Sequence, residues 1–133
     1  MNDTSKKKQA VLIAIYGKKP KSMRQISESI GRRKRAWSPV FLPSNPSAFQ
    51  LGETANQHNI QTYALYLETP KQLTLLQQEI KLLQRLTHNN VHVIVGGTAR
   101  TSNGKLRAKE RFSPDHNVDE FVDMLDEHLD QKK

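Results

Sequence analysis

The stretch that decides the fold is Ala10-Val11-Leu12-Ile13-Ala14-Ile15-Tyr16, a continuous apolar run that ends at Gly17. The run is short for a helix, and its β-branched side chains favour a strand. Because no polar residue alternates with the apolar ones, we expect both faces of this strand to be buried. Such a strand is typical of the centre of a parallel sheet that is covered by helices on both sides.

Apolar segments and helical patterns alternate along the rest of the chain. Further strands are expected at residues 40–42, 60–67 and 91–95, with a short one at 111–113. Apolar spacing and capping residues predict helices over residues 23–35, about 46–57, 70–88 and from 117 onward. Residues 98–111 give no clear pattern. This order predicts an α/β fold, namely a flavodoxin-like (Rossmann-like), doubly wound parallel sheet of about five strands in three α/β/α layers.

The same patterns assign side chains to the core and to the helix ends. The second and third helices are expected to bury Phe49, Leu51, Ala55, Leu73, Leu76, Ile80 and Leu83, with a second stripe at Leu75, Leu82 and Leu86. In the last helix the apolar stripe is Val118, Phe121, Val122, Leu125 and Leu129, and the opposite acidic face is expected to be solvated. Ser22 and Asn117 are predicted N-caps, with Glu120 reaching back to Asn117.

The length of 133 residues suits a single domain, expected at 10–130 after a disordered basic tail at 1–9. The sequence has no cysteine, which excludes disulfides, thiolate metal sites and cysteine nucleophiles. It also has no apolar run long enough for a membrane span and no secretory signal, so a cytoplasmic protein is expected.

The net charge of +8 is concentrated in the first quarter of the chain. Residues 1–35 carry eleven Lys and Arg against two acidic residues, a net +9, whereas residues 36–133 carry ten against eleven, a net −1. This asymmetry indicates an anionic partner, which would be nucleic acid, a phosphorylated ligand or the acidic face of a protein in a larger complex.

Ligands of open α/β sheets bind beyond the carboxyl ends of the strands. After the first strand this rim holds Gly17, Lys18, Lys19, Lys21 and Ser22, and after the fourth it holds Gly96, Gly97 and Thr98. The glycines would allow close approach of a ligand, and the lysines flank a helix N-terminus, which attracts anions. The spacing of a P-loop is absent.

At these strands the chain resembles the cobalamin-binding domain, in particular the stand-alone small subunits of carbon-skeleton mutases. The resemblance covers roughly residues 7–130. The matching segments are Lys8 to Ile13, Val40-Phe41-Leu42-Pro43, Tyr63 to Leu67, Val93-Ile94-Val95-Gly96-Gly97 and Phe112-Ser113-Pro114. The resemblance implies the flavodoxin-like fold, and a tetrapyrrole or cobalamin as the ligand.

The chain departs from this family at the residues that hold the cofactor. Lys19-Pro20-Lys21-Ser22-Met23-Arg24 stands where the family has Asp-x-His-x-x-Gly, so Lys21 replaces the histidine that ligates cobalt. A protonated lysine has no lone pair for a metal, so any bound cobalamin would lack a lower histidine ligand. Where the family has a Ser-x-Leu pattern, this chain has Leu65-Tyr66-Leu67, and Tyr66 would fill part of the nucleotide channel.

No residue pattern of a catalytic or metal site stands out, and the five histidines lack metal-ligand spacing. The sequence therefore predicts a protein that is not an enzyme but a ligand-binding, regulatory or accessory-subunit domain. The alternative is a DNA- or RNA-binding regulator, because residues 24–40 approximate a helix-turn-helix. Its phosphate contacts would come from Arg24, Arg32, Arg33, Lys34 and Arg35. Pro39 inside the expected recognition helix weighs against this alternative.

Overall fold

The computed structural model describes residues 9–17, 21–33, 37–88, 90–102, 105–109 and 114–130. The predicted tail, apart from Gln9, and the strand expected at 111–113 lie outside these residues. The elements are β1 (Gln9–Tyr16), α1 (Lys21–Gly31), β2 (Trp37–Phe41), α2 (Ala48–His58), β3 (Thr62–Leu67), η2 (Pro70–Gln72), α3 (Leu73–Leu86), β4 (His92–Gly97), β5 (Ala99–Ser102), β6 (Lys105–Ala108) and α4 (Pro114–Asp130).

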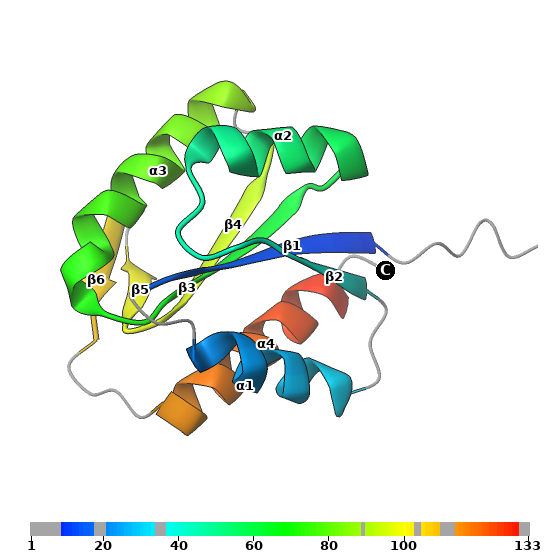
Figure 1. Ribbon diagram of the computed structural model, residues 1–133, viewed down its shortest axis with the longest axis vertical. Coiled ribbons are helices and arrows are strands. Elements are labelled where there is room, and N and C mark those ends of the chain that lie inside the picture. The colour runs from blue at the N-terminus through cyan, green and yellow to red at the C-terminus, as the bar shows by residue number, and fades with distance from the viewer. Residues whose placement is uncertain are drawn as a thin grey trace, which may run out of the picture.

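The first four strands form one parallel sheet in the order β2-β1-β3-β4 (Figure 1). Helices α2 and α3 cover one face of this sheet, and α1 and α4 cover the other. Strand β1 is central, since Ile13 is in register with Phe41 of β2 and with Ala64 of β3. The three layers and the strand order confirm the predicted flavodoxin-like fold, with four strands in the described sheet.

The apolar run of β1 is buried on both faces, as its composition predicts. Leu12 and its alternate neighbours pack into the cluster beneath α2 and α3, whereas Ile13 and its neighbours pack into the cluster against α1 and α4. Both side chains are fully buried. Burying a side chain of this size is worth about 1.5–3 kcal/mol, so this strand is a main source of the domain's stability.

Parts of the predicted core are wrong at the helix surfaces. Phe49 is 63% exposed, because α2 begins at Ala48 with Ser47 as its cap and a capping box to Gln50, a start that directs Leu51 and Ala55 to the sheet. In α3 the stripe of Leu76 and Leu83 is buried, but Leu75 and Leu86, from the second stripe, are 45% and 43% exposed. One helix buries a single apolar stripe against a sheet, and these leucines lie beyond its edge.

Two further differences concern the end of the chain. Residues 98–111, which gave no pattern, include the antiparallel hairpin of β5 and β6. Helix α4 starts at Pro114, so Asn117 lies inside it and does not act as its cap. Within the described residues no helix has the length and apolar character to cross a membrane.

Candidate functional site

The fold places its topological switch point at the carboxyl ends of β1 and β3. These strands are neighbours, and the chain leaves β1 for β2 on one side and later enters β3 on the other. At such a point the loops diverge and leave the strand ends accessible to a ligand. Gly17 follows β1 and Glu68 follows β3 at this rim.

The first turn of α1 already holds an anion, which belongs to the protein. Glu68 Oε2 accepts hydrogen bonds from the backbone N of Ser22 at 2.9 Å and from Ser22 Oγ at 2.8 Å. Ser22 is therefore not the predicted N-cap, since its hydroxyl donates to Glu68 across the rim. The Glu68 side chain also lies against Gly17, where an added Cβ would come within 2.2 Å of Oε1. Gly17 thus makes room for a carboxylate of the chain itself.

Asn45 closes the other side of the β1 end. Its Oδ1 accepts from Gly17 N at 3.0 Å, and its Nδ2 donates to Gly17 O at 2.9 Å. Gln72 Nε2 donates to the same Oδ1 at 3.1 Å. Asn45 has a φ of 58°, a left-handed conformation that asparagine tolerates better than most residues. The sequence places Asn45 at this rim, but its hydrogen bonds with Gly17, 28 residues away in the chain, could not be inferred from the local pattern.

Gly96 and Gly97, the last two residues of β4, pack against other parts of the protein where a ligand was predicted. A Cβ on Gly96 would lie 2.4 Å from Cδ1 of Phe121, and one on Gly97 would lie 2.2 Å from the Leu67 carbonyl oxygen. Gly97 also has a φ of 92°, which strongly favours glycine. Thr98 N and Oγ1 donate to that same carbonyl at 2.8 and 3.1 Å. Asn117 donates to the carbonyl of Gly97 at 2.8 Å, so these contacts join β3, β4 and α4.

Tyr66 is fully buried beside this rim. Its ring meets Phe121 edge-on, with centroids 5.2 Å apart. Within the described residues its hydroxyl makes no hydrogen bond of ordinary geometry. Burial raises the pKa of Tyr66 to about 12, the neighbouring Ser22 hydroxyl opposes this shift, and the carboxylates of Glu68 and Glu120 add to it. Tyr66 therefore presents a neutral O–H group close to the Ser22–Glu68 contact.

The positive charge predicted for the rim is only partly described. Lys18 and Lys19 lie outside the described residues, and for Lys21, the first residue of α1, the backbone alone is described. A cation that the sequence did not single out lies nearby, because Lys109 contacts the carboxylate of Glu120 and its backbone N donates to the carbonyl of Thr98.

These residues do not fit cobalamin. Glu68 fills the space beside Gly17, and the ring of Tyr66 packs against Phe121. Among the described residues, no group of three His, Cys, Asp or Glu side chains could hold a metal ion. No family model matches the sequence, and no curated protein matches it. The resemblance to cobalamin-binding domains therefore stays a prediction.

The helix-turn-helix prediction is wrong. Residues Trp37–Phe41, which would belong to its recognition helix, form β2 and pair with β1 in the central sheet. Pro39 is tolerated there because β2 is an edge strand of the described sheet. Of the five predicted phosphate contacts, Lys34 and Arg35 lie outside the described residues, and Arg24 forms an exposed ion pair with Glu28 at 3.2 Å.

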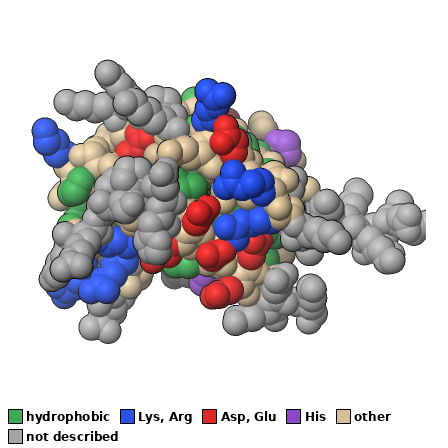
Figure 2. Space-filling view, turned by 90° about the horizontal axis from the view of Figure 1, so that it is seen from below, with side chains coloured by type: hydrophobic (Ala, Val, Ile, Leu, Met, Phe, Trp, Pro, Cys, Tyr) green, Lys and Arg blue, Asp and Glu red, His purple; other side chains and the backbone are tan. Residues whose placement is uncertain are grey.

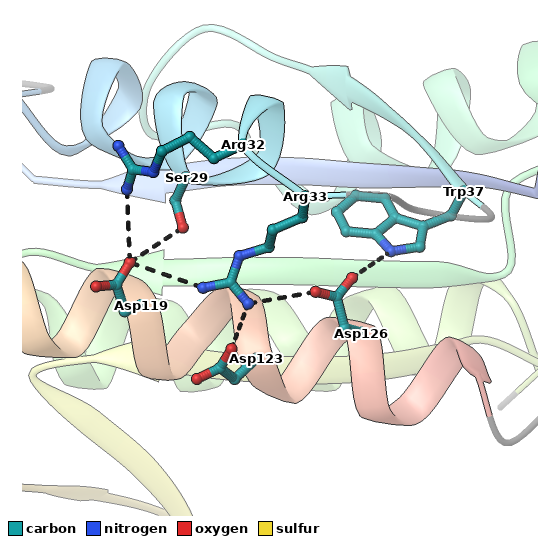
Figure 3. A network of polar contacts seen from close by, with 7 residues as sticks. All are labelled: Ser29, Arg32, Arg33, Trp37, Asp119, Asp123 and Asp126. Atoms are coloured by element: carbon teal, nitrogen blue, oxygen red, sulfur yellow. Dashed lines mark hydrogen bonds and ion pairs between the residues drawn. The ribbon is translucent and has the colours of Figure 1, made fainter.

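Arg32 and Arg33 both lie close to aspartates of α4 (Figure 3). Arg33 forms ion pairs with Asp119, Asp123 and Asp126 of α4, and Arg32 lies 3.9 Å from Asp119. The hydrogen bond with Asp123 and the pair with Asp126 raise the pKa of Arg33, although its burial opposes them. Figure 2 shows Lys or Arg and Asp or Glu side chains interleaved on one face of the molecule. Arg33 therefore stabilises the contact of α1 with α4.

This network also corrects the expectation that the acidic face of α4 is only solvated. Asp119 accepts from Ser29 Oγ at 3.1 Å, and Asp126 accepts from the indole Nε1 of Trp37 at 2.9 Å (Figure 3). The spacing of Asp119, Asp123 and Asp126 puts them on one side of a helix, which is a signal in the sequence. Their partners are about 90 residues away in the chain, so the pairing itself could not be inferred locally.

Proposed function

We propose that this chain is a non-catalytic binding protein, of the regulatory or accessory-subunit kind, that takes an anionic ligand at the carboxyl ends of β1 and β3. The observation that carries this proposal is the carboxylate of Glu68 on Ser22. An oxyanion finds there a backbone N–H, a hydroxyl and the positive end of the α1 dipole. A phosphate or carboxylate group of a ligand has the same chemistry and would replace Glu68 at these donors.

The buried hydroxyl of Tyr66 is a second, independent observation in favour of a ligand here. Within the described residues this hydroxyl makes no hydrogen bond of ordinary geometry, and a ligand oxygen would supply one. In the sequence, Lys18 and Lys19 precede α1 and Lys21 is its first residue, so the chain carries positive charge next to this helix start. A role without catalysis is supported by the way the rim uses its other polar side chains, since Asn45 and Asn117 each hold strand ends together.

Removing the carboxylate of Glu68 should free the hydrogen-bond donors of Ser22 for a ligand. In Glu68→Gln the neutral amide competes less well than a carboxylate for the donors of Ser22. We therefore expect inorganic phosphate and pyrophosphate to bind this variant at least about tenfold more tightly than the wild type. Titration calorimetry measures both affinities. Adding Ser22→Ala to this variant should abolish the gain. The matched control is Glu53→Gln, the same charge change at an exposed position of α2, which should leave phosphate binding unchanged.

Two results would contradict the proposal. One is the absence of saturable phosphate or pyrophosphate binding in Glu68→Gln while its melting curve shows a folded protein. The other is an equal gain in Glu53→Gln, which would assign the effect to net charge. Cobalamin is a separate probe, and a base-off, histidine-ligated spectrum with the wild-type protein would show that the assignment of Lys21 to the ligand position is wrong.

A further inference from the structure

The hairpin of β5 and β6 carries cations that form no ion pair with an acidic side chain of the described residues. Its antiparallel register places Arg100 opposite Arg107 and Ser102 opposite Lys105. Alternate residues of a strand share one face, so Arg100, Lys105 and Arg107 lie on the same side of the hairpin. All three are exposed. None of the ion pairs within the described residues includes any of them.

The other side of the hairpin fixes it to the domain. Leu106 is half-buried against the apolar cluster beneath α2 and α3, and the side chain of Ala99 is fully buried. Thr101 lies opposite Leu106 in the register, and both line a small cleft of about 150 Å³ together with Ile80 and other side chains of α3 and β4. The cationic side, which we call the basic hairpin face (Arg100, Lys105 and Arg107), is therefore held in a fixed orientation and turned away from α3.

The arrangement of the basic hairpin face costs stability. Like charges directly opposite each other on neighbouring strands repel, and Arg100 and Arg107 are such a pair. Arg33 differs from these two arginines, because three aspartates of α4 compensate its charge. Because no carboxylate of the described residues pairs with Arg100 or Arg107, we expect this charge to serve contact with another molecule.

The chemistry of this face favours phosphates over a protein. Interfaces between proteins depend on large apolar or aromatic anchors at their centre. The large apolar side chains that are exposed in the described residues are Phe49, Leu75 and Leu86, all on α2 and α3. Phosphate backbones instead require arginine and lysine donors, and the wide major groove of duplex DNA admits a two-stranded β-ribbon.

We propose that the basic hairpin face binds duplex DNA through its phosphate backbone. Arg100 and Arg107 contact phosphates as a pair, and Lys105 extends the contact toward the hairpin turn. This surface is distinct from the rim at β1 and β3. We assign the phosphate contacts to this face and not to Arg32 and Arg33, because those two arginines pair with aspartates of α4. The contacts carry no base specificity, so binding depends on salt far more than on DNA sequence.

The test compares two double variants that remove the same charge. Arg100→Gln/Arg107→Gln removes the repulsive pair, and Arg24→Gln/Arg85→Gln removes two exposed arginines of α1 and α3. Binding of a fluorescent DNA duplex is followed by anisotropy at several salt concentrations. Each lost phosphate contact lowers the salt slope by about 0.9, so between about 50 and 200 mM salt the wild type should lose about tenfold more affinity than the hairpin variant. The control should behave like the wild type.

A second measurement separates function from folding. Because the repulsion is relieved, the hairpin variant should melt at the same temperature as the wild type or higher. The proposal is overturned if both double variants weaken DNA binding equally, or if the wild type does not bind the duplex at about 50 mM salt. It is also overturned if polyglutamate displaces the duplex as well as unlabelled DNA does, since the face would then fit an acidic protein.

Discussion

The indole Nε1 of Trp37 donates a hydrogen bond of 2.9 Å to Asp126 Oδ1, and the other oxygen of the same carboxylate accepts from Arg33 at 3.3 Å. One side chain of α4 therefore holds both the start of β2 and the segment that follows α1. Trp37 is 1% exposed, so its N–H cannot exchange this acceptor for water. The carboxylate of Asp126 therefore stabilises the packing of α4 against β2 and α1.

Asp126→Ala should lower the free energy of unfolding by about 1–3 kcal/mol, because it leaves the buried indole N–H without an acceptor. Asp126→Asn keeps an acceptor for Trp37 and loses only the charge opposite Arg33, so its effect should be smaller. Glu127→Ala changes a neighbouring exposed residue and should be nearly neutral. Urea unfolding of the three variants provides the comparison, and equal effects of all three would show that the contact contributes little.

The layers of the fold were predictable because each depends on a local pattern. The continuous apolar run of β1 requires burial on both faces, and the stripe of Leu76 and Leu83 requires a sheet beneath α3. The hairpin was not predicted, because its two strands are mostly polar and contain too few apolar residues to show a strand pattern. The contact between Glu68 and Ser22 at the rim was not predicted either. The two residues are 46 positions apart in the chain, and nothing in the sequence next to either of them indicates the contact.

Neighbouring leucines of α3 test the packing directly. Leu76 is fully buried, whereas Leu75 is 45% exposed. Leu76→Ala should cost about 2–5 kcal/mol, since it leaves a cavity against the sheet, and Leu75→Ala should cost well under half as much. Both changes remove the same atoms from the same helix, so helix propensity cancels between them. Thermal or urea unfolding distinguishes them, and similar losses would show that α3 presents a different stripe to the sheet.

Glycine-to-alanine changes separate a required glycine from a dispensable one. Gly96→Ala places a methyl group against the ring of Phe121 and should destabilise the fold by about 1–3 kcal/mol through overpacking. Gly52 lies in α2 with no neighbouring atom within 4 Å of an added Cβ. Gly52→Ala should therefore stabilise the helix by about 0.5–1 kcal/mol. Melting temperatures that move in the same direction for both variants would contradict the packing of Gly96 against α4.

All three tyrosines are buried. Their burial leads us to expect that the protein loses stability when alkali ionises them. Burial raises the pKa of Tyr63 and of Tyr66 to about 12, and burial together with the charge of Glu79 raises that of Tyr16 further. An unfolded tyrosine has a pKa of about 10, so the folded protein holds these protons more tightly than the unfolded chain. The stability from this difference is complete below pH of about 10 and is lost as the pH rises through the folded values.

We therefore expect the ultraviolet absorbance of tyrosinate to rise together with the loss of the circular dichroism of the helices, in one transition above pH of about 10. Tyr66→Phe removes a buried hydroxyl that makes no hydrogen bond of ordinary geometry among the described residues, so the stability at neutral pH should stay the same or rise, and the transition should move to higher pH. Tyr63→Phe removes a hydrogen bond of 3.1 Å to the carbonyl of Leu51 and should cost about 0.5–1.5 kcal/mol at neutral pH. Tyrosines that ionise near pH of about 10 while the helical signal persists would show that the side chains are open to water.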